Sequence, residues 1–120
     1  DWYMSSYANV YTWNDLTVRR ETYFVKGDNA PFTGIVKSFH KNGQLFDKSH
    51  VVDGKEEGIH EVFYENGQLQ VKELFARGKR EGFFEMYYKN GKIKMKCIYK
   101  NGKEEKLEIW DKSGNSIQKN

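Results

Sequence analysis

FHKNGQL at residues 39–45, FYENGQL at 63–69 and YYKNGKI at 87–93 repeat one pattern of aromatic residue, Asn-Gly pair and aliphatic residue. The pairs begin at Asn42, Asn66 and Asn90, a fixed step of 24 residues. A fixed period in this range is typical of repeat proteins. Asn-Gly between alternating apolar residues predicts a tight β-hairpin, because both turn residues can adopt positive φ. The sequence therefore predicts a row of similar hairpins.

Aligning the chain on these pairs divides it into units. Three full units cover residues 34–57, 58–81 and 82–105, and a half unit covers 106–120. We expect one repeat domain over residues 1–120, in which residues 1–33 form a degenerate N-terminal cap, since the end units of repeat proteins are atypical.

The cap has its own predicted alignment. Residues 18–27 align with 69–78, which places Asn14-Asp15 near a turn and puts Tyr11 and Trp13 in an aromatic strand. Pro31 lacks a backbone N–H, so we expect a connecting loop before Gly34.

Each full unit is predicted to contain two strands. The first strands cover about residues 35–41, 59–65 and 83–89, and the second strands cover about 44–52, 68–76 and 92–100. We expect a tight turn at each Asn-Gly pair and a wider turn at the Gly-Lys pair that ends each unit. Apolar and polar residues alternate along the second strands, which indicates one buried and one solvent-exposed face. Leu74 and Ile98 fall on the wet side, which predicts a bulge in these strands.

Composition fits this architecture and excludes several classes of protein. Hydrophobic residues make up 38% of the chain and charged residues 31%, so each strand can bury only one face well. The net charge is +3, with both signs interspersed, which argues against a nucleic-acid surface. Cys97 is the single cysteine, which excludes an internal disulfide and a Cys-rich zinc site. No apolar run approaches the ~20 residues that a membrane-spanning helix needs.

The pattern G-x-x-x-x-(F/Y)-(Y/H)-x-N-G-x-(L/I), followed by a Gly-Lys turn, resembles the MORN repeat variant. This short β-hairpin repeat occurs in bacterial proteins of the YwqK antitoxin family. The resemblance covers residues 34–105 fully and both flanks in part, and it implies protein binding. Related eukaryotic MORN repeats are associated with membranes, phospholipids and protein assembly. The family often has Trp in the first strand, where this chain has Val36, His60 and Phe84.

Two aromatic rows are the first candidate binding surface. One repeat position holds Phe39, Phe63, Tyr87 and Trp110, and the next holds His40, Tyr64 and Tyr88. Neighbouring strand residues point to opposite faces, so at most one row fills the core. An exposed row of Tyr and Trp would suit a binding surface, whereas cross-strand aromatic pairs would stabilise the sheet. The residues predicted to bind a partner are His40, His60, Tyr64, Phe84, Tyr88 and Trp110.

The other candidate residues predict neither a metal site nor a catalytic site. His40, His50 and His60 occupy non-equivalent repeat positions without metal-ligand spacing, so we expect no metal site. Acids at equivalent positions are expected to form a ladder on one face beside lysines, rather than a catalytic pair: Glu61, Glu85 and Glu108, with Lys72, Lys94 and Lys96 as partners. The basic turns at Lys79-Arg80 and Lys103 are expected to be solvated, and Cys97 to be a buried, inert thiol.

We therefore expect an all-β, elongated antiparallel meander of about nine or ten strands, built from stacked MORN-like hairpins. The predicted function is a non-enzymatic protein-binding module without a cofactor, with a toxin-neutralising or immunity-like role implied by the resemblance. The alternative is a structural scaffold of the MORN type, or a membrane-apposed protein that binds lipid. The expected partner is a protein, not a nucleic acid. Contact with an anionic membrane would be weak, and self-association through a sheet edge is a further alternative. The chain begins at Asp1 without Met, which is compatible with a mature exported form and with a simple sequence boundary.

Overall fold

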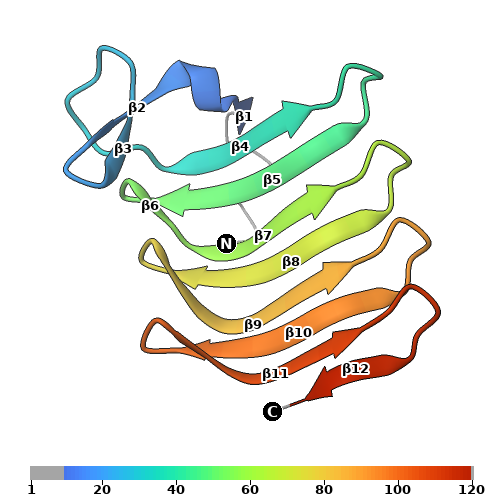
Figure 1. Cartoon of the computed structure of the whole chain (residues 1–120). Helices are drawn as coiled ribbons and strands as arrows, with labels where there is room; N and C mark the ends of the chain where they lie inside the picture. The colour runs from blue at the N-terminus through green and yellow to red at the C-terminus, as the bar shows by residue number, and fades with distance from the viewer. Residues whose placement is uncertain (1–9, 120) are drawn as a thin grey trace.

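The predicted hairpins form and continue into one long, twisted sheet in a computed structural model that describes residues 10–119 (Figure 1). The strands of the repeat units are β4 (Gly34–Phe39), β5 (Leu45–Val52), β6 (Lys55–Glu56), β7 (Gly58–Phe63), β8 (Leu69–Ala76), β9 (Lys79–Tyr87), β10 (Ile93–Lys100), β11 (Lys103–Trp110) and β12 (Ser116–Lys119). They pair antiparallel in chain order, with the short β6 on β5. The all-β meander predicted from the sequence is confirmed.

The N-terminal part departs from the repeat. β1 (Val10–Tyr11) adds to β4 in parallel, so the sheet is mixed, and a 3-10 turn, η1 (Trp13–Asp15), follows it. β2 (Leu16–Arg19) and β3 (Thr22–Val25) form a separate two-stranded hairpin. The alignment of 18–27 with one long strand is wrong, because the chain reverses at Arg20-Glu21, and Tyr11 and Trp13 do not share a strand. Residues 1–9 of the predicted cap lie outside the described residues.

The Asn-Gly turns line one edge of the sheet, at the right of Figure 1, and differ from the prediction. Gly43 has φ +88°, but Asn42 is not at positive φ. The Gly43 N–H donates to His40 O (3.0 Å) and the His40 N–H donates to Gln44 O (2.8 Å). These bonds define a three-residue loop in which glycine alone takes the left-handed conformation. The same bonds recur at the next two Asn-Gly turns and at Ser113-Gly114.

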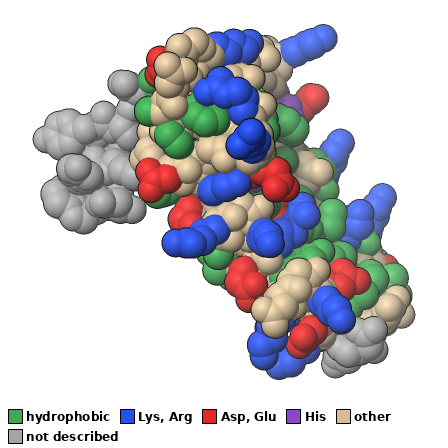
Figure 2. Space-filling model, turned by 90° about the vertical axis from the view of Figure 1, so that its left-hand side faces the viewer, with side chains coloured by type: hydrophobic (Ala, Val, Ile, Leu, Met, Phe, Trp, Pro, Cys, Tyr) green, Lys and Arg blue, Asp and Glu red, His purple; other side chains and the backbone are tan. Residues whose placement is uncertain are grey.

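The two-residue turns lie on the opposite side of the sheet, where the other ends of the strands are joined. Asp53-Gly54, Arg77-Gly78 and Asn101-Gly102 each have positive φ at both residues, which is the type I′ geometry. The wider turn expected here is therefore wrong, and the two turn types have exchanged places. Figure 2 shows this edge, where Lys and Arg side chains are interspersed with Asp and Glu.

The expected bulges also lie elsewhere. The second strands are bulged beside the Asn-Gly loops, at Phe46, Gln70 and Lys94, rather than at Leu74 and Ile98. Opposite Leu74 and Cys97 the extra residues belong to the partner strands β9 and β11.

The core lies at one end of the sheet. Leu16 and Phe32 pack against Val36 and Val51, and Trp13 and Tyr23 join them from the same side. We call the sheet face that bears this cluster the inner face and the opposite one the outer face. The β2–β3 hairpin therefore covers the inner face of the first unit. The single-domain assignment with residues 1–33 as a cap stays a prediction.

Candidate functional site

Strand register places an apolar row across the inner face of the second and third units and of the closing half unit. Each member lies directly opposite the next on the neighbouring strand: Val62, Val71, Met86, Met95 and Ile109. All five are half-buried. We call this row the inner stripe. Because its side chains share one face and two are flexible methionines, the stripe offers an adaptable apolar surface.

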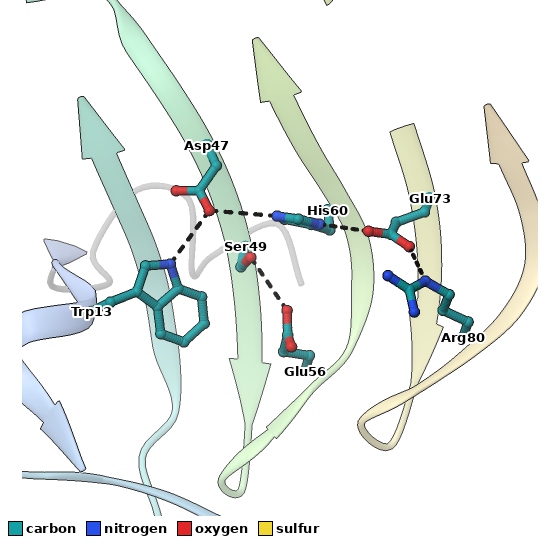
Figure 3. Close-up of polar contacts among 7 residues, drawn as sticks. All are labelled: Trp13, Asp47, Ser49, Glu56, His60, Glu73 and Arg80. Carbon is teal, nitrogen blue, oxygen red and sulfur yellow. Dashed lines mark hydrogen bonds and ion pairs between the residues drawn. The ribbon is translucent and has the colours of Figure 1, made fainter. Parts of the chain in front are cut away.

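A chain of polar contacts crosses the inner face beside the stripe (Figure 3). The Trp13 Nε1–H donates to Asp47 Oδ2 (3.4 Å), and the same oxygen lies 3.5 Å from His60 Nε2. His60 Nδ1 lies 2.8 Å from Glu73 Oε2, and Arg80 Nε donates to Glu73 Oε1 (2.6 Å). These residues come from η1, β5, β7, β8 and β9, so the contacts tie the covered first unit to the open second and third units.

Ser38 and Glu56 complete the group. Ser38 Oγ donates to Asp47 Oδ1, and Ser49 Oγ donates to Glu56 Oε1 (3.4 Å). Asp47 and Glu73 are buried, so their carboxylates need these partners.

The electrostatics of this cluster favour its charged form. Hydrogen bonds to Asp47 and Glu73 raise the pKa of His60 from 6.5 to about 9, against the effect of burial. Burial by itself would raise the pKa of Asp47, but hydrogen bonds from His60, Ser38 and Trp13 lower it overall. Burial likewise acts to raise the pKa of Glu73, and bonds from His60 and Arg80 outweigh it. At neutral pH His60 and Arg80 are therefore cations held by two carboxylates.

This arrangement suits structure better than catalysis. A protonated imidazole with a pKa of about 9 is a poor general base at pH 7, and both of its nitrogens contact carboxylates. The described residues contain no group of three or more His, Cys, Asp or Glu that could hold a metal ion. The three histidines lie in different parts of the sheet. His60 is on the inner face, His40 is at a turn, and His50 is opposite Ile35 on the outer face. Burial, with the charge of Lys48, lowers the pKa of His50.

Two predicted binding residues, His60 and Phe84, lie together on the inner face. They are linked through Glu73, which is opposite His60 on β7 and opposite Phe84 on β9. The Phe84 ring contacts Tyr99 edge-on, with 5.8 Å between ring centroids. The Arg80 guanidinium lies 5.6 Å from the Phe84 ring centroid and 5.9 Å from that of Tyr99. The inner stripe thus borders a half-buried aromatic cluster with an arginine above it.

The row of His40, Tyr64 and Tyr88 lies at the Asn-Gly turns instead. Each side chain donates to the backbone carbonyl one unit ahead: His40 Nε2–H to Phe63 O (2.7 Å), Tyr64 Oη–H to Tyr87 O (2.7 Å) and Tyr88 Oη–H to Trp110 O (2.8 Å). These bonds join consecutive units. The two tyrosine hydroxyls and His40 Nε2 are therefore used within the fold, which leaves the tyrosine ring faces for a ligand.

The other row, Phe39, Phe63, Tyr87 and Trp110, lies on the outer face. Phe39 is 56% exposed, the others are half-buried, and Lys96 lies 6.0 Å from the Trp110 ring centroid. Neither aromatic row belongs to the buried core cluster, which agrees with the expectation that at most one row fills the core. Residues from the N-terminal hairpin and the intervening loop fill the core instead.

The predicted ladder of acids is present on the outer face as one row of alternating charge that includes Lys72 and Lys96. Lys94, the third expected partner, is a bulge residue outside this row. Residues directly opposite one another run, strand by strand, as Lys48, Glu61, Lys72, Glu85, Lys96 and Glu108. Opposite charges directly across neighbouring strands stabilise a sheet. Cys97 is buried at 3% exposure, as predicted, and burial raises the pKa of its thiol.

Sequence reasoning missed Asp47, Glu73, Arg80 and Trp13. Glu73 carried a signal, since it interrupts an otherwise apolar face of its strand between Val71 and Phe75. Lys79 and Arg80 are exposed, as expected, but the Arg80 side chain also pairs with the buried Glu73, which the sequence did not indicate. Nothing local to Asp47 or Trp13 shows that they meet across 34 residues.

The comparisons with known proteins agree with the repeat geometry. A family model described as the MORN repeat variant matches residues 32–53, 56–76 and 80–101, together more than half of the chain. Each matched range spans one Asn-Gly hairpin, β4–β5, β7–β8 or β9–β10. No curated protein matches the chain. Within residues 10–119, no helix is long and apolar enough to cross a membrane.

Proposed function

The chain belongs to the MORN repeat variant family, and from this premise we propose that it is a non-enzymatic module that binds a partner protein. The proposed contact surface is the inner face of the second and third units. It comprises the inner stripe with the adjoining Phe84, Tyr99 and Arg80.

The observation that carries this proposal is a contrast between equivalent positions. Under the β2–β3 hairpin, Val36 and Val51 are fully buried. The residues 48 positions later, Phe84 and Tyr99, are half-buried. Within residues 10–119, the chain therefore covers this face at the first unit and leaves the equivalent positions of the third unit half-exposed. Large aromatic side chains and arginine at the centre of an open apolar surface are typical of protein-binding hot spots.

We propose further that binding acts by steric cover of the partner, in a bacterial toxin-neutralising or immunity-like role. The resemblance to antitoxin repeats supports this role, and the fixed, polar-linked inner face suits a preorganised surface. A toxin-like gene beside the gene for this chain would favour it, and a survey of related loci without one would count against it.

Site-specific photo-crosslinking tests the contact surface. A photoreactive amino acid is placed at Met86 or Met95 on the inner stripe, and at Phe39 or Ile98 on the outer face as matched controls. Both control residues are more exposed, at 56% and 40%. In extracts of the source cells, we expect one stoichiometric adduct from the inner positions and none from the outer ones.

Adducts from the outer positions alone would overturn the proposed surface. Adducts between copies of the chain would indicate self-association in place of a partner. Flotation of the unmodified protein with anionic vesicles, together with no adduct, would favour the membrane-apposed scaffold instead.

A further inference from the structure

The row of Asn-Gly turns contains two hollows that are repeats of one another. The first, of about 330 Å³, is lined by His40, Tyr64, Glu65, Asn66, Gln70 and Lys89. The second, of about 450 Å³, is lined by Tyr64, Tyr88, Lys89, Asn90, Lys94 and Lys112. Each residue of the second hollow stands one repeat unit after its counterpart in the first. We call them turn groove 1 and turn groove 2.

The two grooves differ in charge at equivalent positions. Glu65 of groove 1 is replaced by Lys89 in groove 2, and Gln70 is replaced by Lys94. Groove 1 is lined by one acid and one lysine, whereas groove 2 is lined by three lysines and no acid. The two grooves therefore have equivalent positions in the repeat, and of the two only groove 2 is strongly positive.

The fold holds these lysines in place without neutralising them. Asn66 Nδ2 donates to Lys89 O (3.2 Å) and Asn90 Nδ2 donates to Lys112 O (3.0 Å), which fixes the backbone on both sides of groove 2. The ion pairs within the described residues involve only other side chains, so none of the three lysines has an acid within 4.0 Å there.

Two tyrosine rings that line groove 2 lie close to two of its lysine ammonium groups. Lys89 Nζ lies 5.8 Å from the Tyr64 ring centroid, and Lys94 Nζ lies 5.5 Å from that of Tyr88. Such cation–π contacts favour a side-chain position over the ring. Because both tyrosine hydroxyls donate to backbone carbonyls, groove 2 presents ammonium groups and ring faces to a ligand.

We propose that turn groove 2 binds an acidic segment of a protein, through carboxylates that pair with Lys89, Lys94 and Lys112. That this segment belongs to the partner of the inner face rests on the function proposed above. Three lysines within one hollow match two or three neighbouring carboxylates. Nucleic acid would need a longer basic track, but Glu65 and Asp111 lie at the turns on either side. A membrane would need exposed apolar anchors next to the lysines, and the groove walls offer half-buried tyrosines.

A synthetic peptide with four consecutive Glu, labelled with a fluorophore, tests the proposal against the same peptide with Gln. Exposed ion pairs are weak individually, so three together should make the Glu peptide bind about tenfold tighter. We expect amide NMR shifts on peptide addition at residues 88–94 and 111–113, and weaker binding as salt concentration rises.

Two double variants exchange the grooves. Lys89→Glu with Lys94→Gln leaves groove 2 with one acid and one lysine, as in groove 1, and we expect the tenfold preference for Glu to disappear. Folding should persist, because the second unit already carries Glu65 and Gln70 at these positions. The matched variant, Glu65→Lys with Gln70→Lys, makes groove 1 positive, and we expect a second site for the Glu peptide.

Three results would overturn the proposal: equal binding of both peptides, unchanged binding by the folded Lys89→Glu, Lys94→Gln variant, or shifts confined to other residues. Tighter binding to a single-stranded oligonucleotide, or to phosphatidylcholine–phosphatidylserine vesicles, would overturn it in favour of that ligand. The peptide assay needs no partner and involves no inner-face residue. If the peptide does not bind but Met86 still gives crosslinks, only the groove proposal is contradicted. If the peptide binds but the inner face gives no crosslinks, only the inner-face function is contradicted.

Discussion

Gly54 lies where the N-terminal hairpin meets the first unit. The Tyr23 N–H donates to Gly54 O (2.8 Å), and the Gly54 N–H donates to Phe32 O (2.7 Å). A Cβ on Gly54 would lie 2.2 Å from Thr22 Cγ2 and 3.1 Å from Tyr23 O. Gly54 also has φ +80°, which side chains disfavour. The Gly54→Ala substitution therefore perturbs both the turn and the docking of the hairpin.

The repeat provides a matched control for this substitution. Gly102 occupies an equivalent type I′ turn with φ +79°, and nothing lies within 4 Å of the Cβ that it would gain. Left-handed backbone costs an L-residue about 1–2 kcal/mol, and overpacking costs about 1–3 kcal/mol more. We expect Gly54→Ala to lower the free energy of unfolding by about 2–5 kcal/mol, and Gly102→Ala by about 1–2 kcal/mol.

Urea unfolding followed by far-UV circular dichroism measures both variants, and the midpoints are comparable when the slope m is unchanged. Thr22→Ser removes Cγ2 and keeps the hydroxyl that donates to Arg20 O. In the Gly54→Ala background it should therefore recover part of the lost stability, with Tyr23 O still crowding the alanine. Equal losses for Gly54→Ala and Gly102→Ala would contradict this prediction, because the hairpin would then exert no steric constraint on the turn.

Three further outcomes follow from the inner face and the turns. The pKa of His60, raised from 6.5 to about 9, means that its ion pairs stabilise the fold fully below pH 6.5 and lose this effect as pH rises through 9. The stability lost over this pH range is about 3 kcal/mol. The urea midpoint of the wild type should therefore fall more with rising pH than that of His60→Gln, and an equal pH dependence of the two midpoints would contradict the prediction. Asn66→Ala removes an acceptor within its turn and a donor to Lys89 O, at about 1–2 kcal/mol. Asn66→Asp keeps the acceptor and should cost less in the same assay; an equal cost would exclude a role for the acceptor. Glu73→Gln should cost about 2 kcal/mol and more than Arg80→Gln, because Glu73 is buried and Arg80 is half-exposed; the reverse order of midpoints would argue against it.

The sequence predicted the strands well because the repeat reports the same pattern three times. Predicted and observed strands of the full units agree closely at most ends, and alternation assigned Cys97 to the buried face correctly. The turns were predicted from local preference alone, and that was insufficient. Asn66 donates to the next unit, a contact that favours the three-residue loop and that no single hairpin reveals. Asn101-Gly102 is a fourth Asn-Gly pair, out of phase with the others, and it does form the tight type I′ turn.

The N-terminal hairpin and the inner polar cluster were harder to predict for a different reason. The hairpin reverses at Arg20-Glu21, where both residues have positive φ without a glycine to signal it. The cluster depends on register, because one residue of slip would move Asp47 or Glu73 to the other face. Their partners, Trp13 and Arg80, lie on other elements, so only the assembled sheet brings them together.

The hydrogen bonds that join successive units along both edges give the molecule a mechanical anisotropy. A force that separates β12 from β4 acts across the stack, so it meets one strand pair at a time and peels the units off in sequence. A force along the strands must break all the bonds of a pair at once. The first unit, clamped by the hairpin at Gly54, would be the last to yield to peeling, and the four-residue β12 the first. Tension transmitted through a bound partner would therefore erode the module from its C-terminal side and leave the hairpin-covered end intact.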